Sequence, residues 1–204
     1  MADAVVVIDY GMGNLFSVES ALRYLGASTT LTADPDVVAR AHRVILPGVG
    51  SFRLAMERIR GAHLDAAILE LVKRGDHLLG ICLGMQLLGS ASSEDGETPG
   101  LGLIPNRVDS FDTRLGMKVP HIGFNTITPT HRDGLFAELP DSPDFYFVHS
   151  YRMAVGTMAH PHATCEYGEP FLAAFDAGNV RGAQFHPEKS QSNGLQVLRN
   201  FAVA

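Results

Sequence analysis

Short apolar runs alternate with amphipathic stretches in the first half of the chain. The run AVVVIDYG at residues 4–11 is almost continuously apolar, which is typical of a strand buried on both faces. After Asn14, a predicted helix N-cap, leucine and valine recur at helical spacing as far as Gly26, the predicted end of the helix. This stretch therefore predicts a strand, a glycine turn and a helix.

The same alternation continues to about residue 90. The segment HRVILPGVGSF at 42–52 predicts a strand that runs into a glycine-rich loop, and HLLGI at 77–81 predicts a buried central strand. Between them, apolar residues at helical spacing predict a helix over 64–72 that ends at Gly75. Strands that alternate with helices favour an α/β fold, with a central, mostly parallel sheet flanked by helices.

The pattern changes after Ser90. Residues 92–106, SSEDGETPGLGLIPN, predict a polar loop rich in glycine and proline. The later segments predict strands joined by short turns, including a hairpin that turns at 177–179, and the chain closes with a helix from Ser192. We therefore expect an antiparallel strand extension of the sheet, within a single domain that spans residues 1–204.

Composition and charge limit the possible functions. A chain of 204 residues with 46% hydrophobic content can bury a full core. The 16 basic and 22 acidic residues form no basic block, so we expect no nucleic-acid partner and no membrane partner. The start lacks a basic leader with a cleavage site, and no stretch is as long as a membrane span, so we expect a cytoplasmic protein. Cys82 and Cys165 are predicted to be free thiols.

Cys82 lies in the sequence GICLG, which has the glycine spacing of a nucleophile elbow with cysteine in place of serine. The predicted context is a strand, a sharp turn and a helix. Glycines without a Cβ allow such a turn, and a helix N-terminus favours the thiolate. The alternative is an inert buried thiol in a tight turn, and the motif alone does not decide between the two.

A candidate base follows a predicted strand in the sequence QFHPEKS. His186 and Glu188 are two residues apart, so in an extended chain their side chains point to the same side. They predict a triad in which Cys82 attacks a carbonyl carbon, His186 transfers the proton and Glu188 orients the imidazole. The alternative is an exposed histidine and glutamate after a strand, which the elbow disfavours. An acid just after the histidine argues against the esterases of the α/β-hydrolase fold.

The sequences GICLGMQLL and QFHPEKS resemble the two signatures of class I (triad-type) glutamine amidotransferases. Six motifs in order also resemble the glutaminase branch of imidazole glycerol phosphate synthases: VIDYGMGNLFSVESALRYLGA, ILPGVGSF, ETPGLGLIP, VPHIGFN, YFVHSY and QFHPEKSQ. This resemblance implies that L-glutamine is hydrolysed through a thioester at Cys82. It also implies a heterodimer with a TIM-barrel cyclase subunit, which uses the ammonia in histidine biosynthesis. No cofactor is implied.

The resemblance also implies roles for individual residues. The oxyanion donors are the amides of Leu83 and Val49, and the glycines beside Val49 allow its peptide to reorient. The implied glutamine-binding positions are Gly50, Gln86, His149, Ser150 and Tyr151. The implied partner interface consists of Asn14, Phe124 and Lys189. The chain departs from the family pattern at two places, with Phe124 where tryptophan is common and Asn106 where glycine is common, and neither place is in the triad.

Other candidates and two rival functions complete the sequence-based picture. Cys165 is predicted to be a core thiol, and no Cys/His cluster completes a metal site around His160 and His162. A glutaminase of the anthranilate or para-aminobenzoate type usually has histidine where this chain has Met85, and the DYGMGNLFSV start also argues against it. A non-catalytic binding subunit with the same fold is the other rival, and the intact triad argues against it.

Overall fold

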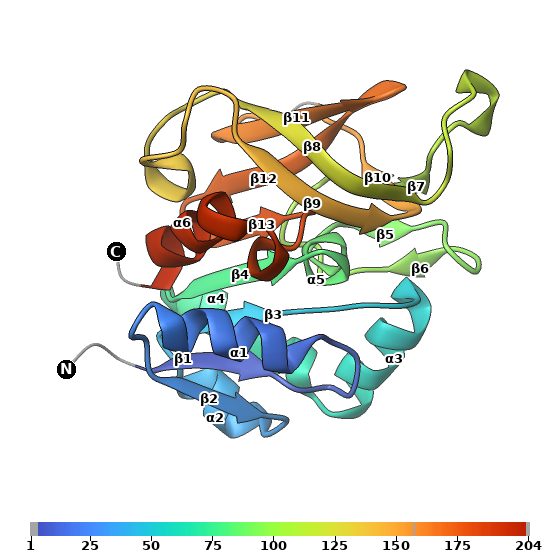
Figure 1. The fold of residues 1–204 in the computed structure, drawn as a ribbon. Helices are drawn as coiled ribbons and strands as arrows, with labels where there is room; N and C mark the ends of the chain where they lie inside the picture. Colours follow the sequence, from blue (N-terminus) through green and yellow to red (C-terminus); the bar gives the residue numbers. More distant parts are fainter. Residues whose placement is uncertain (1–3, 157, 203–204) are drawn as a thin grey trace.

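The computed structural model describes residues 4–156 and 158–202, and a nine-stranded sheet runs through it (Figure 1). The first five strands in the sheet order are parallel and the last four pair antiparallel. The order is β2 (Thr29–Thr32), β1 (Val5–Ile8), β3 (Arg43–Leu46), β4 (His77–Ile81), β13 (Val180–Ala183), β12 (Glu169–Ala177), β11 (His162–Tyr167), β8 (His121–Pro129) and β9 (Asp144–His149). The predicted parallel sheet with an antiparallel extension is therefore confirmed.

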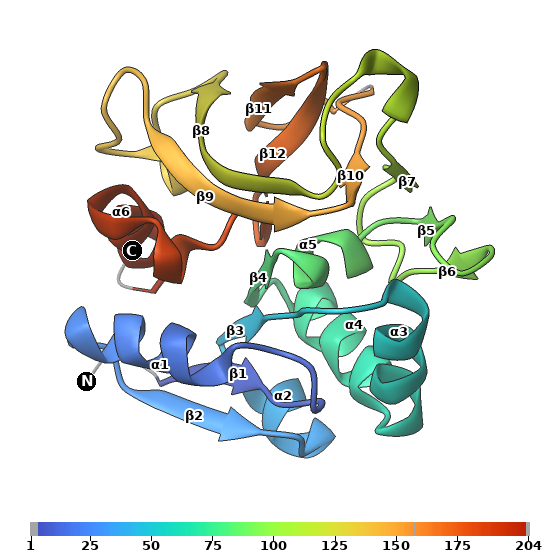
Figure 2. The ribbon, with the colours of Figure 1, turned by 45° about the vertical axis from the view of Figure 1, so that its right-hand side comes forward.

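Helices cover both faces of the parallel strands (Figure 2). The helices α1 (Leu15–Tyr24) and α6 (Gln191–Ala202) pack on one face, while the other face is covered by α2 (Pro35–Arg40), α3 (Phe52–Gly61) and α4 (Leu64–Arg74). Side chains of β1 alternate between the two resulting cores, with Val5 and Val7 in one core and Val6 and Ile8 in the other. Burial on both sides explains why this strand is continuously apolar in the sequence.

A second, four-stranded sheet lies beside the first. Its order is β10 (Tyr151–Met153), β7 (Val108–Ser110), β5 (Ala91–Ser92) and β6 (Thr98–Pro99). The segment DFYFVHSYRM leaves the large sheet after β9 and enters the small sheet as β10, so Ser150 lies at the crossing point. The remaining elements are short: α5 (Leu83–Leu87) and the 3₁₀ turns η1 (Thr113–Leu115), η2 (Gly134–Phe136) and η3 (Pro187–Lys189).

The predicted helix ends are mostly confirmed. Asn14 is the N-cap of α1, as predicted, although its side chain makes no capping hydrogen bond. Gly26 ends this helix with φ +80°, and Gly75 ends α4 with φ +90°, both in the left-handed region that favours glycine. The hairpin turn between β12 and β13 contains Gly178 with φ +76°, as predicted.

Helices α2 and α3 were not predicted from the sequence, although the buried residues of α3 follow helical spacing: Phe52, Ala55, Met56 and Ile59.

Throughout residues 4–156 and 158–202, no helix combines the length and the apolar character that a membrane crossing requires.

Candidate active site

Cys82 occupies a sharp turn between β4 and α5, with φ 55° and ψ −113°. A non-glycine residue pays a conformational cost for positive φ, and such strain is typical of active sites. Close packing explains both flanking glycines. A Cβ added at Gly80 would lie 2.6 Å from the Gly84 carbonyl oxygen, and one added at Gly84 would lie 1.8 Å from the Leu46 carbonyl oxygen. The geometry is therefore that of a nucleophile elbow.

His186 and Glu188 are joined behind the cleft. Their side chains are 3% and 1% exposed, and His186 Nδ1 lies 2.8 Å from Glu188 Oε1. Because a carboxylate accepts, Nδ1 carries the proton and donates it. Within the described part of the chain, His186 Nε2 is buried without a hydrogen-bond partner. Burial opposes the imidazolium, but the adjacent Cys82 sulfur and the Glu188 carboxylate stabilise it, so the pKa of His186 lies above its ordinary value of 6.5.

The backbone of His186 is braced by two neighbours that the sequence analysis did not single out. Its N–H donates to the Tyr146 carbonyl over 2.9 Å, and its carbonyl accepts from the Ser190 hydroxyl over 2.6 Å. The same Ser190 oxygen accepts from the Tyr146 N–H over 2.9 Å. These bonds tie the turn that carries the base to β9, and they limit how far the imidazole can move.

One cleft of about 340 Å³ brings most of the predicted residues together. Cys82 and His186 both line it, whereas Glu188 lies behind His186 and is not part of the wall. All seven predicted oxyanion and glutamine-binding positions also line it: Val49, Gly50, Leu83, Gln86, His149, Ser150 and Tyr151. The predicted interface residues Asn14, Phe124 and Lys189 do not line it.

Two amides of this cleft are available as donors. Among the described residues, neither the Leu83 N–H nor the Val49 N–H donates a hydrogen bond. Val49 lies in the loop between β3 and α3 and is 42% exposed. The loop presses against the elbow, because a Cβ added at Gly48 would lie 2.9 Å from the Gly84 nitrogen. A tetrahedral oxyanion requires two N–H donors, and these two free amides can supply them when both point into the cleft.

Buried amide side chains connect the nucleophile to the far wall of the cleft. Gln86 Nε2 donates to the Tyr151 carbonyl and to Gln184 Oε1, both over 2.9 Å. Gln184 is fully buried, and its Nε2 lies 3.9 Å from Cys82 Sγ. Gln184 was not predicted as a site residue, although a glutamine inside the apolar run GAQF is the kind of signal that marks a polar residue in a core.

His149 contributes to the wall without a free polar atom. Its Nδ1 lies 2.8 Å from the Tyr151 carbonyl, so Nδ1 carries the proton and Nε2 is left as an acceptor. His121 Nδ1 donates to that Nε2 over 3.0 Å. Burial lowers the pKa of His121 to about 4 and that of His149 to about 3, so both imidazoles are neutral. A direct role of His149 in glutamine binding stays a prediction.

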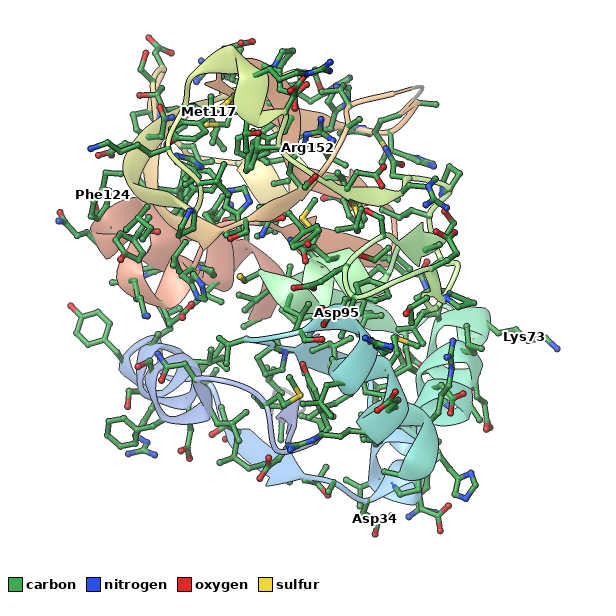
Figure 3. The ribbon with its side chains drawn as sticks, turned by 90° about the vertical axis from the view of Figure 1, so that its right-hand side faces the viewer. Asp34, Lys73, Asp95, Met117, Phe124 and Arg152 are labelled. Atoms are coloured by element: carbon green, nitrogen blue, oxygen red, sulfur yellow. The ribbon has the colours of Figure 1, made fainter. Side chains whose placement is uncertain are left out.

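Glu94 is a lining residue that the sequence analysis missed. Its carboxylate faces the cleft, and its Oε2 accepts from the Phe52 N–H at the start of α3 over 2.8 Å. Burial raises the pKa of this carboxyl. The neighbouring Asp95 accepts from the Ser51 hydroxyl over 2.9 Å instead and lies where the polar loop meets α3 (Figure 3). The only available signal was an acidic pair in a loop that follows the elbow helix.

Two of the three predicted interface residues share one aromatic ring. Phe124 is 47% exposed, projects from the rim of the molecule, and packs edge to face on Tyr146 with 5.6 Å between ring centroids (Figure 3). Lys189 Nζ lies 5.8 Å from the centroid of the same ring. Asn14 lies at the start of α1, and this helix contacts η3, which contains Lys189. The contact of all three with a partner stays a prediction.

Metal ligation has no support in the described residues. Within residues 4–156 and 158–202, no three His, Cys, Asp or Glu side chains come together in a way that could hold an ion. His162 Nδ1 instead bonds the His160 carbonyl over 2.8 Å. Cys165 is buried in β11, where burial raises the pKa of its thiol to about 12, as expected for a core cysteine.

Comparisons with known proteins match almost the whole chain to one family. The model of the family "Glutamine amidotransferase class-I" matches residues 6–204. The chain is 47% identical over 197 residues to the imidazole glycerol phosphate synthase subunit HisH of Moorella thermoacetica, which covers 97% of this chain and 93% of that protein. It is 45% identical over 202 residues to the subunit of the same name from Salinibacter ruber, with the same two coverages.

Solved structures share the fold at low sequence identity. The chain superimposes on a glutamine amidotransferase with a TM-score of 0.76 and 18% identity, over 97% of this chain and 96% of the other. It superimposes on PurLQS from Thermotoga maritima with a TM-score of 0.75 and 18% identity, over 98% of each chain.

Proposed function

The chain belongs to the class I glutamine amidotransferase family, and we propose that it is the glutaminase subunit of an imidazole glycerol phosphate synthase, which hydrolyses glutamine to glutamate and ammonia. The observation that carries this proposal is that one cleft is lined by the strained Cys82, by His186 with its unpartnered Nε2, and by Leu83 and Val49, whose amides are free. The family match extends to residue 204, so a single amidotransferase domain over residues 1–204 is part of the proposal.

The first half of the reaction forms a thioester. The Cys82 thiolate attacks the side-chain amide carbon of glutamine, and the carbonyl oxygen becomes an oxyanion that the Leu83 and Val49 amides stabilise. As the carbon–nitrogen bond breaks, His186 Nε2 gives its proton to the departing nitrogen, which leaves as ammonia. Glu188 holds Nδ1 throughout and stabilises the imidazolium before this transfer.

The second half releases glutamate. His186, now neutral, takes a proton from a water molecule, and the resulting hydroxide attacks the thioester carbon. A second oxyanion forms at the same two amides, and the carbon–sulfur bond breaks to return the Cys82 thiolate. His186 thus gives a proton in the first half and takes one in the second half, and no cofactor enters either half.

The ends of the substrate amino acid need opposite charges. We assign Glu94 to the α-ammonium, because it is the acidic side chain that lines the cleft and its Oε1 has no partner among the described residues. Gly50, Ser150 and Tyr151 offer neutral donors for the α-carboxylate. Gln86 also lines the cleft and stays a proposed glutamine-binding residue, while its Nε2 holds the Tyr151 backbone.

The partner belongs to the same proposal. The ammonia would pass to a cyclase subunit with a TIM-barrel fold in a heterodimer, and both subunits would be cytoplasmic. The exposed Phe124, the adjacent Lys189 and the Asn14 turn are the candidate contacts on this chain. The proposal includes no membrane and no nucleic acid.

The experiment that tests the proposal compares three proteins: the wild type, Cys82→Ala and Cys165→Ala. Each is incubated with a glutamine analogue that has an electrophilic carbon at the amide position, and adduct mass and ammonia release from glutamine are measured with the liganded cyclase present. We expect the wild type and Cys165→Ala to be labelled and active, and Cys82→Ala to be neither, while it still binds the cyclase. Ammonia release by Cys82→Ala would contradict the triad.

A further inference from the structure

The hydroxyl of Tyr10 is a buried group that the chemistry above does not use. Tyr10 follows β1 and is 7% exposed, yet its hydroxyl has no hydrogen-bond partner among the described residues. Buried polar groups are nearly always paired, so this hydroxyl calls for a partner, which a water molecule or another conformation of its neighbours can supply.

The hydroxyl lies directly against the loop of residues 47–50, here called the oxyanion loop. A Cβ added at Gly48 would lie only 2.5 Å from Tyr10 Oη. Val49 lines the cleft and Tyr10 does not, so the tyrosine approaches this loop from the protein interior. Burial and the nearby charge of Cys82 raise the pKa of Tyr10 despite the opposing charge of Arg58, so the hydroxyl keeps its proton and can donate it.

Peptide geometry supplies the missing acceptor. The Gly48 carbonyl and the Val49 N–H belong to one planar trans peptide, so they point in opposite directions. When the N–H is turned into the cleft, the carbonyl is turned toward the interior, where Tyr10 Oη lies. Gly48 lacks a side chain, which permits this rotation and also leaves the space that the hydroxyl occupies.

We propose that Tyr10 is a positioning residue of the oxyanion loop, whose hydroxyl donates to the Gly48 carbonyl when the Val49 N–H is turned into the cleft. This inference rests on the proposed glutaminase function and deepens it, because it names the group that stabilises the competent orientation of the loop. A single neutral hydrogen bond shifts such an equilibrium by about three- to tenfold.

The test uses the complete complex of this chain with the liganded cyclase and compares the wild type, Tyr10→Phe and Tyr24→Phe. Phenylalanine fills the same space as tyrosine, and Tyr24 offers a matched control because its side chain is exposed on α1. For Tyr10→Phe we expect kcat for glutamine to fall about three- to tenfold at unchanged KM. Alkylation of Cys82 by a haloacetamide should keep its rate, because displacement at a saturated carbon forms no oxyanion.

If the hydroxyl had a purely structural role, Tyr10→Phe would lower the midpoint of thermal unfolding. Loss of an unpaired buried hydroxyl should instead leave the midpoint equal or raise it, so a fall in kcat without a fall in midpoint supports the proposal. Equal kcat in Tyr10→Phe and the wild type would overturn it, and so would a parallel loss of alkylation, since the tyrosine would then act on the nucleophile. Failure of the proposed function is distinguishable, because the wild-type complex itself would release no ammonia.

Discussion

At the scale of single residues, the charge of His186 depends on two neighbours, the Cys82 sulfur and the Glu188 carboxylate. Glu188 accepts the Nδ1 proton, and the carboxylate is one of the groups that raise the pKa of His186 above 6.5. In the proposed mechanism the imidazolium protonates the departing nitrogen, so we expect activity to be lost as pH rises through this raised pKa. We therefore expect the carboxylate to contribute to the alkaline limit of the reaction as well as to orient the ring.

Glu188→Gln should move that limit. Removal of the negative charge lowers the pKa of His186, so the alkaline limb of the kcat/KM profile should shift to lower pH. Turnover should fall less than in His186→Ala, because in triad hydrolases loss of the acid costs about two orders of magnitude less than loss of the base. The measurement is ammonia release by the complex from pH 6 to 10, with Glu57→Gln on the exposed face of α3 as control. An unmoved limb, or a slower rate than in His186→Ala, would contradict these roles.

Glu94→Gln tests the assignment of the α-ammonium site. Loss of one charge-assisted hydrogen bond should raise KM for glutamine about 10- to 100-fold and leave kcat nearly unchanged. Asp95→Asn is the matched control, since Asp95 is adjacent but bonds Ser51 and does not line the cleft. A substrate without the α-amino group should be hydrolysed equally by Glu94→Gln and the wild type. If the wild type hydrolysed that substrate faster than Glu94→Gln does, Glu94 would not act through the α-ammonium group.

The difference between predicted and missed residues has a physical cause. Cys82, His186 and Glu188 lie in local motifs whose spacing already encodes the turn and the side-chain directions. Gln184 and Tyr10 acquire their roles from contacts with residues far away in the sequence, and the Gln86–Gln184 bond spans 98 positions. No local pattern reports such a contact, so only the folded chain reveals it.

At the scale of elements, the pairing of β8 with β9 places His121 directly opposite His149. His121 stacks on Tyr167 with 3.9 Å between centroids and on Phe147 with 4.9 Å. This burial keeps both imidazoles neutral, with pKa values of about 4 and 3 against 6.5 in the ordinary case. The strand pair therefore takes up protons less readily than the unfolded chain does.

The consequence is a stability that falls on the acid side of neutrality. Between pH 6.5 and about 4 the unfolded chain binds protons that the folded chain does not, so the free energy of unfolding falls with pH by up to about 1.4 kcal/mol per pH unit for each histidine. His121→Asn keeps an N–H near the position of Nδ1 but cannot titrate. The slope of the free energy of unfolding against pH should therefore decrease by up to the contribution of one histidine. Urea unfolding at several pH values measures the slope.

The exposed His160 offers the control for that experiment. His160→Asn should keep the wild-type slope between pH 6.5 and 4. If His121→Asn and the wild type lost stability equally over this range, the buried pair would not be the origin of the acid sensitivity.

Sequence periodicity predicted most elements but not where the chain changes sheets. The apolar residues of 144–153 continue through Ser150, because each strand is buried on its own sheet, so the pattern shows one run where the structure has β9 and β10. This change of sheet is what places Ser150 and Tyr151 in the cleft. The site thus depends on the chain crossing from one sheet to the other, which the alternation of apolar and polar residues does not reveal.

At the scale of the whole molecule, the turn of residues 10–14 connects the predicted interface to the oxyanion loop. A Cβ added at Gly13 would lie 3.4 Å from Pro47, and one added at Gly50 would lie 2.9 Å from the Met12 methyl group. Pressure on Asn14 from a partner would therefore reach the oxyanion loop through direct contacts. Lys189 immediately follows Glu188 and packs on Tyr146, whose backbone braces His186.

This arrangement predicts that the isolated chain is a poor glutaminase. If the Val49 N–H is turned into the cleft only when the liganded cyclase is bound, ammonia release should rise about two to three orders of magnitude on its addition, which is the value of one oxyanion donor. Asn14→Ala and Lys189→Ala should blunt this rise more than they weaken glutamine binding. Lys73→Ala, at an exposed end of α4 that points away from the molecule (Figure 3), should not. Equal rates with and without the partner would show that the oxyanion hole is already formed in the free chain, because a donor that depends on the partner would make the two rates differ.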